Sequence, residues 1–224
     1  MKFDYTYITL FGYTVFEPMV MLTNMIFLVL TILFAKRLLS FPMVYAKQMA
    51  LFILSLGLGM IVGAIGHAVH EQAGKGFFNL ILVVMNVFSL FSVFFCFRGC
   101  LILTNGRKEP KVWLVLVGII LMVMLVVSVM RADFTIIKIM AGSVLIFALI
   151  AHYRDWNKTG RIGNKWVIAG ILVSFLSLVA HTLHISLHAW FNHKDLSHVI
   201  MIVGIVTIYK GIRKNSESMV AAGI

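Results

Sequence analysis

The 224-residue chain is 61% hydrophobic and only 12% charged, with a mean hydropathy of +1.01. This composition excludes a water-soluble domain, which would need far more polar side chains to cover its surface. The net charge of +11 suggests binding to a polyanion, but the distribution of the charges along the chain favours another explanation.

Seven apolar runs follow one another along the chain, and each is long enough to cross a bilayer as a helix. They cover roughly Ile8–Phe34, Tyr45–His70, Phe77–Leu103, Val112–Met130, Phe134–His152, Lys165–His188 and His193–Ile212. We therefore predict an all-α fold, a polytopic integral membrane protein with seven transmembrane helices in one bundle and a single domain over residues 1–224. We expect no cleavable signal peptide, because Met1–Thr6 carries one lysine and Glu17 interrupts the first run.

The basic residues gather at one end of the predicted bundle. We define side A as the end that holds the N-terminus and side B as the end that holds the C-terminus. Of the 19 lysines and arginines, 14 fall at side B and five at side A. The positive-inside rule then predicts a cytoplasmic side B and C-terminus and an external N-terminus. This asymmetry explains the basic charge without a nucleic-acid partner.

Polar residues interrupt the first two predicted helices. Glu17, Asn24 and Thr31 recur every seven residues, which places them on one stripe facing the bundle interior. For Glu17, a salt bridge to Lys138 and a role in a site are equally compatible with the sequence. The second run ends in a glycine-rich segment that carries two histidines, at positions 67 and 70, on one face next to side A.

The middle helices offer fewer candidates. Asn79 and Asn86 form a predicted inner polar stripe on the third helix, and the nearly unbroken apolar fourth helix is expected at the outside of the bundle. Cys96 and Cys100 are expected to pack or remain free thiols rather than form a disulfide. His152 is predicted to be an interfacial surface residue in the basic group at side B.

Five of the eight histidines fall within the segment HTLHISLHAWFNHKDLSH, residues 181–198. If the sixth helix continues to position 188, its three histidines at 181, 184 and 188 share one face. Asn192 fits the N-cap of the seventh helix, with Asp195 in the capping-box position, although a role in the site is also open for Asp195.

Helix connectivity brings seven histidines towards side A, together with Glu17 and Asp195. Imidazoles from several helices are typical ligands of zinc, and two facing imidazoles are sufficient for haem. The predicted metal ligands are His67, His184, His188 and His198, followed by His70, His181 and His193.

This layout resembles the CREST superfamily of seven-helix membrane hydrolases and receptors, which includes alkaline ceramidases, progestin/adipoQ receptors and haemolysin III-type proteins. The resemblance implies zinc held by a histidine late in the second helix, His67 or His70, and by two early in the seventh, His193 and His198. This chain departs from the family pattern at Gly63, where a serine is usual, and at Asn79, the nearest candidate for an aspartate. It also departs in the spacing of the two histidines of the seventh helix.

Three functions are compatible with these residues. The first is a zinc-dependent hydrolase of a lipid amide or ester, with Glu17 or Asp195 as general base and membrane lipid as substrate. The second is a b-type haem protein with His67 and either His181 or His184 as axial ligands. The third is a metal-free receptor, carrier or proton-coupled channel in which histidines and Glu17 titrate.

Overall fold

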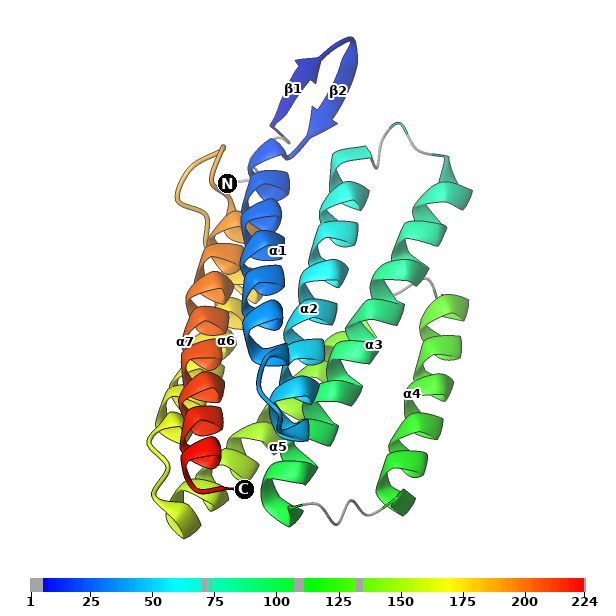
Figure 1. Ribbon diagram of the computed structural model, residues 1–224. Helices are drawn as coiled ribbons and strands as arrows, with labels where there is room; N and C mark the ends of the chain where they lie inside the picture. The colour runs from blue at the N-terminus through cyan, green and yellow to red at the C-terminus, as the bar shows by residue number, and fades with distance from the viewer. Residues whose placement is uncertain (1–5, 70–71, 73, 107–110, 132–134, 224) are drawn as a thin grey trace.

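The computed structural model describes the chain except for residues 1–5, 70–71, 73, 107–110, 132–134 and 224. The described residues form one hairpin and seven helices (Figure 1). These elements are β1 (Tyr7–Leu10), β2 (Tyr13–Phe16), α1 (Pro18–Leu39), α2 (Val44–Val69), α3 (Lys75–Asn105), α4 (Lys111–Arg131), α5 (Thr135–Thr159), α6 (Gly163–Thr182) and α7 (His193–Ala221). The predicted all-α bundle is confirmed, with the hairpin as an addition.

Each of these seven helices is long and apolar enough to cross a membrane. The shortest, α6, has 20 residues, and at 1.5 Å per residue it extends about 30 Å, the thickness of a bilayer's hydrocarbon core. Successive helices alternate in direction, so the hairpin and the last turn of α7 lie at opposite ends of the bundle (Figure 1). These dimensions are consistent with an integral membrane protein.

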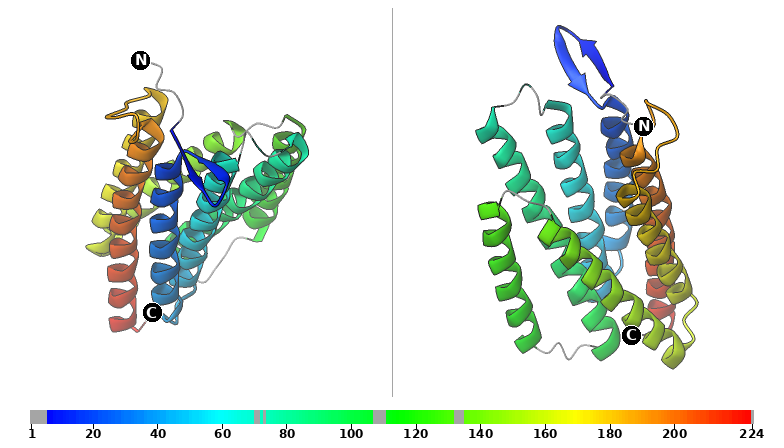
Figure 2. Two further views of the ribbon diagram at one scale, coloured as in Figure 1. Left: turned by 90° about the horizontal axis from the view of Figure 1, so that it is seen from above. Right: turned by 180° about the vertical axis from the view of Figure 1, so that it is seen from behind.

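Six of the helices form a closed ring. Around it α1 packs on α2, α2 on α3, α3 on α5, α5 on α6, α6 on α7, and α7 returns to α1. The remaining helix, α4, lies outside the ring against α3 and α5, at the edge of the bundle in both figures (Figure 2). Only Leu121 and Ser128 of α4 are buried, so the prediction that the fourth helix lies at the outside of the bundle is confirmed.

The predicted start of the first helix, at Ile8, is wrong. Residues 7–16 form an antiparallel hairpin in which Tyr7 pairs with Phe16 and Leu10 with Tyr13. The two residues between the strands, Phe11 and Gly12, have φ angles of 52° and 83°, as a tight two-residue hairpin turn requires. The helix begins only at Pro18, whose fixed φ suits the first helical position.

The α6–α7 pair is held by close contact between glycines and the facing backbone. A methyl group added at Gly211 would lie 2.6 Å from the carbonyl oxygen of Gly163, and one at Gly170 would lie 2.8 Å from the carbonyl oxygen of Gly204. Such separations leave no room for any side chain larger than hydrogen. The two helices therefore pack backbone to backbone, as small residues allow in membrane bundles.

Several other helix ends differ from the predicted ones, and one of these differences affects the site. α5 and α7 extend further towards side B than predicted, to Thr159 and Ala221. In contrast α6 ends at Thr182, six residues before the predicted end at His188. The segment between α6 and α7 is therefore a loop, which we call the 183–192 loop.

Candidate functional site

Glu17 is the centre of a charged cluster at side A. It occupies the N-cap position of α1 with a φ of 48°, and only 3% of its surface is exposed. The Lys194 ammonium on α7 donates to both carboxylate oxygens at 2.7 and 2.8 Å, and His67 Nδ1 on α2 lies 2.9 Å from Oε2. The salt-bridge partner is therefore Lys194, and the predicted partner Lys138 was wrong. Glu17, His67 and Lys194 are called the Glu17 cluster below.

The partners of Glu17 determine its protonation. Burial alone would raise the pKa of this carboxyl group, but the hydrogen bonds from His67 and Lys194 and the charge of Lys194 outweigh burial and lower the pKa to about 2. Glu17 is thus ionised at neutral pH. A carboxylate with so low a pKa, already bound by two donors, is a weak general base.

Contact with Glu17 also determines the tautomer of His67. An ionised carboxylate can only accept hydrogen bonds, so Nδ1 of His67 must carry the proton and donate it. The other ring nitrogen, Nε2, then carries the lone pair when the ring is neutral. Because the His67 side chain is 44% exposed, water from side A can reach this ring.

His198, one turn deeper on α7, has the opposite tautomer. Its Nδ1 lies 3.0 Å from Nδ2 of Asn24 and 3.3 Å from the Thr23 hydroxyl. The Asn24 amide nitrogen also donates to the Val20 carbonyl at 2.7 Å, which fixes the orientation of the amide. His198 Nδ1 is therefore the acceptor, and its proton resides on Nε2. Asn24 and Thr31 are buried on α1, as the predicted polar stripe requires.

Asp195 serves first as a helix cap. Asn192 accepts hydrogen bonds from the backbone of Lys194 and Asp195, and the Asp195 carboxylate accepts from the Asn192 backbone at 3.0 Å, which completes the predicted capping box. The other carboxylate oxygen, Oδ1, is buried without a hydrogen-bond partner among the described residues. The catalytic role predicted for Asp195 stays a prediction.

Three imidazoles meet where the 183–192 loop joins the helices. The ring centroid of His193, at the start of α7, lies 4.6 Å from the ring centroid of His184 and 5.4 Å from that of His181. The prediction that His181, His184 and His188 share one helix face is wrong. His184 has left the helix with a φ of 52°, and His188 lies in the turn of the loop, where its Nδ1 accepts from the Trp190 backbone at 3.2 Å. We call His181, His184 and His193 the histidine trio.

The described residues do not fit a zinc site. No group of three histidine, cysteine, aspartate or glutamate side chains is placed to hold a metal ion within the described parts of the chain. His67 has one feature of a zinc ligand, because its Nδ1 is bonded to a carboxylate. His198 has the opposite tautomer, and His70 lies outside the described residues. Zinc and haem ligation remain predictions.

The comparisons with known proteins place the chain in a family. A family of unknown function (DUF6962) matches residues 19–217, nearly the whole length from α1 to α7. The chain belongs to this family. No curated protein and no solved structure matches this chain. The matched region covers the helix ring and leaves out the hairpin and Glu17.

Two further predictions for inner residues can be compared with the structure. Asn86 is buried on α3 and donates to Ser128 of α4 at 2.6 Å, whereas Asn79 is exposed, so the predicted inner stripe is wrong at Asn79. A side chain at Gly63 would begin 3.0 Å from the Met85 sulfur, so this position has little room for the serine of the CREST pattern. Cys96 and Cys100 are free and buried, as predicted.

The prediction that His152 is a surface residue is wrong. It is fully buried near side B, where its Nδ1 donates to Asn164 at 2.7 Å. Asn164 also accepts from Asn215 at 2.8 Å and donates to Asp155 at 2.7 Å, and Asp155 is ion-paired with Arg161. The sequence signal for this side B network was the presence of His152 and Asp155 one turn apart on α5, followed by Asn164 at the start of α6.

Proposed function

We propose that this protein is a proton-responsive receptor or carrier of the membrane, whose side A site rearranges when histidines take up protons. The observation that carries the proposal is the histidine trio, in which the ring centroid of His193 on α7 lies 4.6 Å from that of His184 in the 183–192 loop and 5.4 Å from that of His181 on α6. Protonation of two of these rings would place like charges in contact, which drives them apart.

The charges around the histidine trio favour the same response. On α7, Lys194 adjoins His193, and on α5 the ammonium of Lys138 acts on His181. Glu17 acts on His193 as the opposing negative charge. Because Lys194 and His67 already bind Glu17, one carboxylate faces several positive groups once the histidines are protonated. The expected consequence is movement of the 183–192 loop away from α7.

The Glu17 cluster connects the histidine trio to the first two helices. His67 Nδ1 on α2 lies 2.9 Å from the Glu17 carboxylate, and Lys194 in the first turn of α7 donates to the same carboxylate. A displacement at the start of α7, next to His193, would therefore be transmitted to α1 and α2.

Trp190 provides a local test of this function. It is the only one of the four tryptophans near side A, since Trp113, Trp156 and Trp166 lie near the side B ends of their helices. In a variant with these three replaced by Phe, acrylamide quenching of Trp190 fluorescence is expected to rise as the pH falls from about 7 to about 4, because burial and neighbouring positive charges shift protonation of two histidines of the trio below the ordinary histidine range. Replacing the histidine trio with Gln should flatten this pH dependence.

Two controls separate the proposal from its alternatives. A variant that keeps only Trp156, at side B, should show constant quenching over the same pH range. Constant quenching of Trp190 in the otherwise unchanged protein would refute a proton-responsive loop. Stoichiometric zinc in protein purified without chelator, lost in both His67→Ala and His198→Ala, would instead support the hydrolase, and a Soret band would support haem.

We also propose that side A is external and side B cytoplasmic, on the basis of the 14 to five division of basic residues. A reporter enzyme that is active only outside the cytoplasm should function when fused before Met1 and fail when fused after Ile224. The reverse pattern would invert the orientation and place the histidine trio at the cytoplasmic face.

A further inference from the structure

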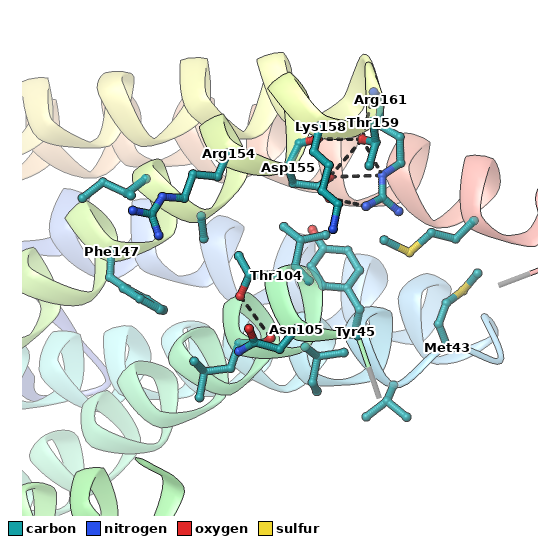
Figure 3. A pocket seen from close by; sticks show the side chains of 18 of the residues that line it. Met43, Tyr45, Thr104, Asn105, Phe147, Arg154, Asp155, Lys158, Thr159 and Arg161 are labelled. Carbon is teal, nitrogen blue, oxygen red and sulfur yellow. Dashed lines mark hydrogen bonds and ion pairs between the residues drawn. The ribbon is translucent and has the colours of Figure 1, made fainter. Parts of the chain in front are cut away.

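A cavity of about 870 Å³ lies at side B, at the opposite end of the bundle from the histidine trio. Figure 3 shows the side chains that line it. Its walls come from the loop between α1 and α2, the first turn of α2, the end of α3, the second half of α5 and the end of α7. The volume is at the upper end of the range of about 300–1,000 Å³ that is usual for small-molecule sites. We call it the side B cavity.

One face of α5 makes the side B cavity apolar at one end and cationic at the other. Phe147, Ile150 and Ala151 line it towards the middle of the helix, and Arg154 and Lys158 line it towards the side B end. Figure 3 shows Phe147 beside Arg154, and Lys158 further along the same helix towards Arg161. The apolar lining therefore lies deeper in the bundle, and the cationic lining lies at its end, where lipid headgroups of a bilayer would be.

Two of the three cationic side chains that line the cavity are outside the ion pair between Arg161 and Asp155. Arg161 is ion-paired with Asp155, which accepts a second hydrogen bond from Asn164, so this pair is neutral overall. Within the described part of the chain, Arg154 and Lys158 form no ion pair. Among the described residues, these two positive charges line the cavity without a counter-charge of their own.

The deeper part of the side B cavity is apolar. Ile150 lines it from α5 and is 44% exposed. The opposite wall is formed by apolar residues such as Met43, Leu103 and Met219. An alkyl chain in this part of the cavity would contact mainly apolar side chains, with its head towards Arg154 and Lys158.

We propose that the side B cavity binds one anionic amphiphile, an alkyl or acyl chain with a phosphate or carboxylate head that pairs with Arg154 and Lys158. The chain would lie along Phe147 and Ile150. Charge-assisted hydrogen bonds to the head provide the affinity that distinguishes such a molecule from neutral lipid. This site does not depend on the proposed function at side A.

The test is equilibrium binding of dodecyl phosphate to the full chain in a neutral maltoside detergent, measured by native mass spectrometry. Neutral alkyl chains are then always present, so any bound ligand reports the anionic head. We expect saturable binding of one molecule. Arg154→Gln/Lys158→Gln should raise the Kd at least about tenfold, because two charged hydrogen bonds are lost. Both side chains are exposed, so this variant should fold.

The matched control is Lys36→Gln/Arg37→Gln, which removes the same charge from the exposed side B end of α1, outside the cavity lining. Its Kd for dodecyl phosphate should be unchanged, and dodecanoate should compete for the site. Inorganic phosphate and dodecyltrimethylammonium should not compete. Equal weakening by both double variants, no saturation, or equal competition by inorganic phosphate would each overturn the proposal.

Discussion

Gly211→Ala is expected to lower the free energy of unfolding by about 3 kcal/mol, and the melting temperature in detergent by roughly 5–10 °C. The added methyl group would lie 2.6 Å from the Gly163 carbonyl oxygen and 2.6 Å from the Val167 backbone nitrogen. Neither atom can move without its helix, so α6 and α7 must separate. The loss of packing along this interface is what destabilises the protein.

Gly118→Ala is the matched control for this prediction. Gly118 is also a helical glycine, in α4, but a methyl group there would meet no atom within 4 Å. Alanine is favoured over glycine in a helix by about 1 kcal/mol, so this variant should be as stable as the wild type or slightly more stable. Equal melting temperatures for both variants would show that α6 and α7 do not pack backbone to backbone.

The α6–α7 interface also matters for both polar sites. α7 carries Lys194 and His198 at side A and Asn215 in the network at side B, and α6 carries His181 and Asn164 at the corresponding ends. Separation of the two helices should therefore change the pH response of Trp190 as well as the stability. This links the fold to the proposed function.

The helices could be predicted from the sequence because a bilayer demands long apolar runs, and hydropathy detects these directly. The capping box of Asn192 and Asp195 was also predictable, since both residues are local in sequence. The hairpin was missed because residues 7–16 are as apolar as a helix start. The alternation of its strands and the turn at Gly12 were the signals to read.

The site was harder to predict because its contacts join distant segments. Nothing in the local sequence indicates that Glu17 pairs with Lys194, 177 residues away, or that His198 contacts Asn24. The histidine spacing at positions 181, 184 and 188 suggested one helix face, but the chain leaves the helix after Thr182. The prediction that histidines converge towards side A needed only the order and direction of the helices. It is confirmed for the histidine trio, His67 and His198.

Glu17→Gln is expected to lower the free energy of unfolding by about 2–3 kcal/mol at neutral pH, because it removes the buried carboxylate that accepts two hydrogen bonds from the mostly buried Lys194 ammonium. Adding Lys194→Met should restore part of the loss, and the double-mutant cycle should give a coupling energy of about 1–2 kcal/mol. Glu217→Gln is the matched control, since Glu217 pairs with Arg213 at the same 2.7 Å but in an exposed position. There the free energy of unfolding should be nearly unchanged, because solvent screens an exposed ion pair.

The stabilisation by Glu17 should depend on pH with a definite sign. Its pKa is lowered from 4.5 to about 2 in the folded protein, a difference that corresponds to about 3 kcal/mol. A lowered carboxyl pKa stabilises the folded state above the unfolded pKa, and this stabilisation disappears as the pH falls through the folded pKa. The difference in melting temperature between wild type and Glu17→Gln should therefore be constant from about pH 8 to about pH 5 and should shrink between about pH 4.5 and about pH 2. A difference that instead vanishes between about pH 7 and pH 5 would mean that Glu17 takes up its proton there, and that the Glu17 cluster does not hold an ionised carboxylate.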